Sequence, residues 1–161
     1  VISGNGSLSK SGAGTLTLSA ANTYTGLTTV SAGSLTYGIN NAISTGAVTV
    51  NGSTAILALS TFSDSVGAVT LTEGSITGSG TLTSTSGFTA DPTTVSVSAS
   101  PILAGSVALT KSGSGTLILS AGNTYTNTTT ISAGTFAITG SGSLSTTSAR
   151  SWPVNVLGSC C

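Results

Sequence analysis

Short runs that alternate between apolar and polar residues fill most of the chain. The stretch at 15–19 reads T-L-T-L-S, and the stretch at 116–120 reads T-L-I-L-S. In an extended strand, alternate side chains point to opposite faces, so the leucines share one face and most hydroxyls the other. We therefore expect the four leucines to be buried, namely Leu16, Leu18, Leu117 and Leu119.

Similar runs continue along the chain, with centres roughly every 7 to 13 residues, which is typical of many short strands. They include the segments 35–37, 47–50, 55–59, 69–72, 81–83, 95–97, 107–109 and 136–138. No segment repeats apolar residues at the spacing of a helix. The pattern predicts an all-β fold, and a sandwich, a barrel and a β-solenoid all use strands of this length.

A long internal duplication favours the solenoid. Residues 4–35 recur at 105–136 with a shift of 101 residues, and 20 of the 32 aligned positions are identical. Duplication at a long period usually indicates an array of stacked units. A coil of three short strands takes about 20 to 25 residues, so the chain should form roughly six or seven coils. Besides the leucines, the repeat motif pairs Lys10 with Lys111, Asn22 with Asn123, Tyr24 with Tyr125 and Gly33 with Gly134.

Composition excludes several classes of protein. Ser and Thr make up more than a third of the 161 residues, charged residues are 4%, and the net charge is zero. Disorder normally requires few apolar residues and much charge, whereas 38% of this chain is hydrophobic. Three basic residues are too few for a nucleic-acid footprint. No apolar run approaches the ~20 residues of a membrane-spanning helix.

Candidate catalytic chemistry is sparse. There is no His, and the acidic residues are only Asp64, Glu73 and Asp91, which we interpret as isolated, solvated loop residues. We expect no enzyme activity, no cofactor and no metal site. Lys10 and Lys111 are expected to be solvated at coil corners. The Asn-Thr-Tyr-Thr tetrads at 22–25 and 123–126 are interpreted as turns in which Asn caps the backbone and Tyr covers the end of a core layer.

The repeat motif itself resembles a known family. Residues 12–35 and 113–136 share the pattern G-x-G-T-L-x-L-S-x-x-N-T-Y-T-x-x-T-T-[VI]-S-A-G-[ST]-[LF]. This pattern is similar to the autotransporter-associated β-strand repeat, or passenger-associated transport repeat, of bacterial type V secretion. The resemblance implies a right-handed parallel β-helix on the bacterial surface or released from it. It also implies a parent protein with a signal peptide and an outer-membrane barrel; the chain lacks Met, so we expect a processed product or a piece of a longer protein.

The last residues differ in composition from the rest. Segment 148–161 holds the only Trp, the only Arg and both cysteines, Cys160 and Cys161. Adjacent cysteines pair only with strain, so an interchain disulfide and a non-family terminus both stay open. We expect a β-helix over residues 1–147, in which spacer coils separate the two repeats, and a non-repeat tail over 148–161.

These observations predict a non-enzymatic scaffold in the passenger of an autotransporter, extracellular or on the cell surface. It would serve adhesion or self-association, with a second copy or a host or surface ligand as partner, without nucleic acid and without inserting into the membrane itself. A filament subunit, or a solenoid that binds ice or polysaccharide through arrays of Thr, are the alternatives. Ice binding needs aligned Thr pairs, and we expect the Thr-x-Thr pairs at 15–17, 23–25, 81–83, 124–126 and 128–130 to scatter over different faces.

Overall fold

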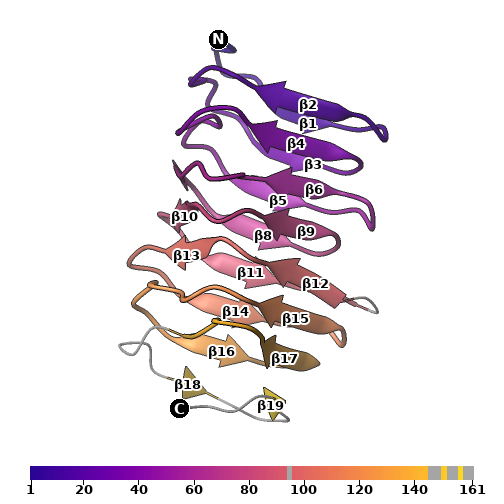
Figure 1. Ribbon diagram of the computed structural model, residues 1–161, viewed down its shortest axis with the longest axis vertical. Helices are drawn as coiled ribbons and strands as arrows, with labels where there is room; N and C mark the ends of the chain where they lie inside the picture. Colours follow the sequence, from indigo (N-terminus) through magenta and orange to yellow (C-terminus); the bar gives the residue numbers. More distant parts are fainter. Residues whose placement is uncertain (94–95, 145–149, 152–155, 158–161) are drawn as a thin grey trace.

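The computed structural model describes residues 1–93, 96–144, 150–151 and 156–157, and its regular secondary structure there is entirely β. Figure 1 shows the strands stacked in successive layers from the N-terminus to the C-terminus. Every strand pair is parallel, and the strands form three sheets, which we call A, B and C. This arrangement confirms the predicted parallel β-solenoid.

Each coil passes through sheet A, then sheet B, and then a third side. Sheet A consists of β1 (Leu8–Lys10), β3 (Thr28–Val30), β5 (Val48–Val50), β8 (Val69–Leu71), β11 (Phe88–Ala90), β14 (Leu109–Lys111), β16 (Thr129–Ile131) and β18 (Arg150–Ser151). Sheet B consists of β2 (Thr15–Leu18), β4 (Ser34–Tyr37), β6 (Ile56–Ala58), β9 (Ser75–Thr77), β12 (Ser96–Ala99), β15 (Thr116–Leu119), β17 (Thr135–Ile138) and β19 (Val156–Leu157). Sheet C, on the third side, contains only β7 (Asp64–Val66), β10 (Thr81–Ser84) and β13 (Ile102–Ala104).

The coils are nearly uniform in length. Successive strands of sheet A from β1 to β16 begin 19 to 21 residues apart, at the short end of the expected range, and six coils separate Leu8 from Thr129. The 101-residue duplication therefore corresponds to five coils, which places β14 in the same position of its coil as β1.

The core is a column of apolar side chains enclosed by the three sides. In β3, β5, β8, β14 and β16, the first and third residues are buried and the middle one is half-buried, as period-two alternation requires. Leu18, Leu117 and Leu119 are buried. The expectation that Leu16 is buried is wrong: its side chain is 37% exposed. It lies on β2, the edge strand of sheet B, and no coil covers it on the N-terminal side.

The expected boundary at residue 147 stays a prediction. Within the expected tail, the structure describes only β18 and β19, whose backbones pair with β16 and β17. Cys160 and Cys161 lie outside the described residues. Among the described residues there is no helix of the length and hydrophobicity needed to cross a bilayer.

Candidate functional site

The two repeat lysines are buried at the corner between sheets A and B. Lys10 is 6% exposed, and its Nζ donates hydrogen bonds to the carbonyl oxygens of Ser11, Gly12 and Ala32 at 3.2, 2.7 and 2.9 Å. An ammonium group has three N–H donors, so this cage satisfies all of them. The expectation of a solvated Lys10 is wrong.

Lys111 repeats the cage five coils later and is fully buried, so the expectation of solvation is wrong here too. Its Nζ donates to the carbonyls of Ser112, Gly113 (2.7 Å) and Ala133 (3.1 Å). Two of these carbonyls belong to its own corner and the third belongs to the next coil, as with Lys10. Each lysine therefore ties two consecutive coils together.

The repeat asparagines also join consecutive coils, on the third side, where the repeat coils have no strand. The side-chain oxygen of Asn22 accepts from the amide of Ile2 at 2.7 Å, and its Nδ2 donates to the carbonyl of Ala42 at 2.6 Å. Asn123 bridges Leu103 and Ser143 in the same way, at 3.0 and 2.9 Å. Each amide thus adds to the backbone hydrogen bonds that join the coils on this side, such as those from Thr23 to Ile2 and from Thr124 to Leu103.

The repeat tyrosines are core residues and do not merely cover the end of a layer. Tyr24 is 1% exposed and Tyr125 is fully buried. The hydroxyl of Tyr24 shares a 2.6 Å hydrogen bond with that of Thr28, and Tyr125 shares one of 2.8 Å with Thr129. In both pairs the threonine is four residues after the tyrosine, so the bond spans the corner where the chain passes from the third side into the next strand of sheet A.

Gly33 and Gly134 close the corner over the lysine cage. Their φ angles are +64° and +72°, which L side chains rarely adopt. A Cβ at Gly33 would lie 2.4 Å from the carbonyl oxygen of Gly14, and one at Gly134 would lie 2.3 Å from that of Gly115. Only glycine fits at either corner.

Comparison with family models matches two segments, residues 8–36 and 109–138, to the passenger-associated-transport-repeat. These two segments are similar to that repeat, and together they span less than half of the chain. No curated protein matches the chain, and no solved structure matches it either. The lysine and asparagine side chains of both segments join one coil to the next, and the tyrosine hydroxyls bond across a corner of the coil.

Asp64, between the repeats, is a buried carboxylate and not the solvated loop residue that its isolation predicted. It is 4% exposed, and its two oxygens accept hydrogen bonds from the amides of Ile43 at 2.9 Å and Ser65 at 2.7 Å. The buried hydroxyl of Tyr37 lies beside it and has no partner at hydrogen-bond distance among the described residues. Glu73 and Asp91 are half-buried, and Asp91 accepts a 2.9 Å bond from the Ser112 hydroxyl.

Asp64 should make the protein less stable as the pH rises. Burial raises the pKa of Asp64 above its usual value, although the two amide donors oppose the shift. Because the folded protein binds this proton more tightly than the unfolded chain does, the protonated carboxyl adds to the free energy of unfolding. This contribution is complete below the unfolded pKa of 3.8 and is lost as the pH rises through the folded pKa. Urea unfolding as a function of pH should show this fall, and Asp64→Asn should remove it. Glu73→Gln, which leaves Asp64 intact, should retain it; a stability that rises with pH over this window would contradict the assignment.

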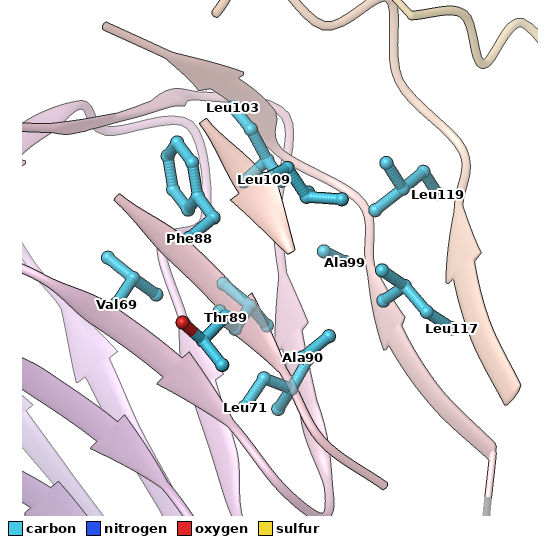
Figure 2. A pocket seen from close by; sticks show the side chains of 11 residues that line it. Val69, Leu71, Phe88, Thr89, Ala90, Ala99, Leu103, Leu109, Leu117 and Leu119 are labelled. Atoms are coloured by element: carbon cyan, nitrogen blue, oxygen red, sulfur yellow. The ribbon is translucent and has the colours of Figure 1, made fainter. Parts of the chain in front are cut away.

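A small cavity of about 20 Å³ lies in the core next to β11 and β12. Figure 2 shows that it is surrounded by apolar side chains of β8, β11, β12 and β15 and their neighbours; Thr89 also borders it but is exposed on the outer face of β11. Ala90 and Ala99 stand here in positions that adjacent coils fill with Leu71, Ile76 or Leu119. Small-molecule sites measure hundreds of Å³, so this cavity is a packing defect and not a binding site.

Filling the cavity should stabilise the protein. Ala99→Val adds two methyl groups toward the empty volume, and we expect a gain of about 0.5–1 kcal/mol in the free energy of unfolding, in the range typical of cavity-filling changes. Guanidinium unfolding measures it. The matched control is Ala55→Val, at a fully buried alanine away from the cavity, where overpacking should destabilise by about 1–3 kcal/mol. Equal losses in both variants would show that the cavity cannot accept the side chain.

One feature that sequence analysis missed is a column of hydroxyl residues along the outside of sheet A. The middle residues of its strands pair in register from coil to coil, and they are Ser9, Thr29, Thr49, Thr70, Thr89, Thr110 and Thr130. All are half-buried or exposed. The signal was present in the sequence, because a Thr between two apolar or strand-forming residues recurs every 19 to 21 residues from Thr29 to Thr130.

The Thr-x-Thr pairs, in contrast, lie on different sides of the coil, as predicted. The pair at 15–17 is on β2, the pair at 81–83 is on β10, and the pair at 128–130 runs into β16. The pairs at 23–25 and 124–126 lie on the third side, outside the strands. They form no common array.

Proposed function

We propose that this chain is a non-enzymatic structural segment of the passenger of a bacterial autotransporter, secreted or displayed at the cell surface. Its work is to form an extended scaffold that supports adhesion or self-association. The observation that carries the proposal is the use of the repeat residues: the lysines and asparagines of both passenger-associated transport repeats join one coil to the next, and the tyrosines hold the corner between the third side and sheet A. Residues used in this way build length, which is what a projecting scaffold requires.

The charge distribution supports the same role. Asp64, the one acidic residue in the described core, accepts from two backbone amides and has no second carboxylate among its hydrogen-bond partners. Acid–base hydrolysis of a polysaccharide uses a pair of carboxyl groups that flank one bond. The described residues contain no group of three His, Cys, Asp or Glu side chains that could hold a metal ion.

The location can be tested on intact cells of the source organism. An antiserum against the purified chain should label unpermeabilised cells or the culture medium, and external protease should remove the label. Adhesion and self-association are tested separately, by binding of chain-coated beads to surfaces and host cells and by sedimentation of the purified chain. A chain found only in the cytoplasm would refute the surface role. A chain that neither adheres nor self-associates would restrict its role to that of a spacer.

A second candidate function is binding of ice or an ordered polysaccharide, and the threonine column on sheet A favours it. The column presents six consecutive Thr hydroxyl groups at the ~4.8 Å spacing of stacked strands. A flat ice face needs a second, parallel column of Thr. The residues two positions further on are Ser31, Asn51, Thr72, Asp91, Ser112 and Ser132, which are too mixed to provide it.

The two functions are separated by thermal hysteresis and by pull-down with insoluble polysaccharides. A scaffold should show neither activity. If either is seen, Thr49→Lys and Thr70→Lys in the middle of the column should abolish it. The matched control, Ser75→Lys and Ser98→Lys, adds the same charge to sheet B, where these two residues pair in register, and should leave the activity in place.

A further inference from the structure

Asn51 stands at the corner between sheets A and B, directly after β5, and its side chain is exposed. Within the part of the chain that the structure describes, neither this side chain nor the backbone amide of Gly52 takes part in a hydrogen bond. The repeat asparagines differ, because Asn22 and Asn123 are buried with both ends of the side-chain amide bonded, and each precedes a threonine. The Asn51 side chain is thus free to turn toward the main chain that follows it.

An unbonded asparagine that precedes glycine has a reaction open to it that needs only water. Hydroxide removes the amide proton of Gly52, and the nitrogen attacks the side-chain carbon Cγ of Asn51. A bond forms between that nitrogen and Cγ, the bond from Cγ to Nδ2 breaks, and the leaving nitrogen takes a proton from water and departs as ammonia. Glycine has no Cβ beside the attacking nitrogen and hinders the resulting succinimide ring least. Water then opens the ring at either carbonyl, which yields aspartate or isoaspartate.

We propose that Asn51 is a site of spontaneous deamidation, with the Gly52 amide as the internal nucleophile and water as the co-reactant. The product carries a carboxyl group that is ionised at neutral pH, so the net charge of the chain changes from zero to −1. The fold also keeps the reactive pair in place, since a Cβ at position 52 would lie 2.0 Å from the carbonyl oxygen of Ser31. The inference rests on this corner and not on the proposed function.

The two products should differ in their effect on the fold. Aspartate fits, because Asp91 already stands at the aligned corner two coils later. Isoaspartate instead adds one methylene carbon to the main chain between Asn51 and Gly52. The Asn51 amide donates to the carbonyl of Val30 at 2.9 Å, and the Gly52 carbonyl accepts from the amide of Ala55 at 2.8 Å. We expect the longer main chain to break one of these bonds and loosen the corner.

The test follows the folded full chain at mildly alkaline pH. Asn5→Ser is present throughout, because it removes the Asn-Gly pair at 5–6 and introduces the serine that the second repeat has at 106. We expect one new species with one more negative charge and about 1 Da more mass, formed faster as the pH rises. After unfolding, a protease that cleaves before aspartate but not before isoaspartate should cut only part of this species at residue 51. Asn51→Ser, which introduces the residue of the aligned corner at Ser31, should prevent its formation.

Asn51→Asp is the matched control for the effect on the corner. It has the same charge as the deamidated chain and a main chain of normal length. The backbone amides of residues 51 and 55 should therefore exchange hydrogen in this variant as they do in the starting chain. In the isoaspartate fraction they should exchange about tenfold faster, because the corner opens locally.

Three results would overturn the inference. One is an Asn51 that stays intact in the folded chain while the urea-unfolded chain is converted in the same time, since the fold would then hold the side chain away from Gly52. Another is a new species with aspartate alone at residue 51, because direct hydrolysis would then have bypassed the ring. Equal exchange in the isoaspartate fraction and in Asn51→Asp would contradict the expected loosening of the corner. None of these results bears on whether the chain is found at the cell surface.

Discussion

Replacing Lys111 with Met should lower the free energy of unfolding by about 2–4 kcal/mol, because three carbonyl oxygens lose a charged donor in a buried corner. Met matches the length of the lysine stem and keeps its apolar packing, so the loss reports on the ammonium group. The side chain is fully buried, and burial lowers the pKa of Lys111 while Asp91 opposes this shift. The burial of the charge therefore offsets part of the gain from its hydrogen bonds. Denaturant unfolding measures the net effect.

Lys10→Met is the internal control for this change. Its cage has the same three bonds but lies in the first coil, where the side chain is 6% exposed and water can reach the freed carbonyls more easily. We expect a smaller loss than at Lys111. If Lys111→Met is neutral or stabilising, the cost of burying the ammonium group equals or exceeds the stabilisation from its hydrogen bonds. The cage would then determine the backbone conformation at the corner without adding to stability.

Leu117→Ala should cost about 2–5 kcal/mol, as removal of a large buried side chain usually does. Leu117 packs between Val97 and Phe136, its register partners in the coils before and after it. The matched variant is Leu16→Ala, which makes the same change in the same T-L-x-L context. Since Leu16 is 37% exposed and lacks a partner on one side, we expect about 1 kcal/mol or less there.

Thermal and denaturant unfolding of the two variants check this pair. Equal losses would mean that Leu16 is covered in solution, for example by a second molecule, and a concentration series would then reveal that molecule. A loss below about 1 kcal/mol at Leu117 would contradict the packing of the second repeat.

The fold was predictable because two independent periods agree. The alternation in T-L-T-L and T-L-I-L identified strands, and the 101-residue duplication indicated stacked units, so a parallel solenoid followed from sequence. The exposure of Leu16 could not be predicted in this way. Its local sequence is nearly that of Leu117, and the two differ only in whether another coil lies in front of them.

The polar groups of the core were harder to predict, for a physical reason. Lys and Asp are seldom fully buried unless their charges are satisfied, and the sequence does not show where backbone carbonyls or amides converge. Lys111 is satisfied by three carbonyls, and Asp64 by two amides, because corners and third-side turns bring unpaired backbone groups together. The threonine column could have been predicted from the sequence, because its threonines recur every 19 to 21 residues, which is the length of one coil.

The near-uniform coil length also determines how a gene for such a chain can change in size. The two repeats are 101 residues apart and lie in the same position of their coils, so unequal recombination between their coding sequences would add or remove five whole coils. The joined strands would stay in register, every lysine cage would keep its next coil, and no new loop would be needed. The length of the solenoid can therefore change in steps of about 24 Å, five times the ~4.8 Å strand spacing, and natural versions of the gene should differ by multiples of this unit.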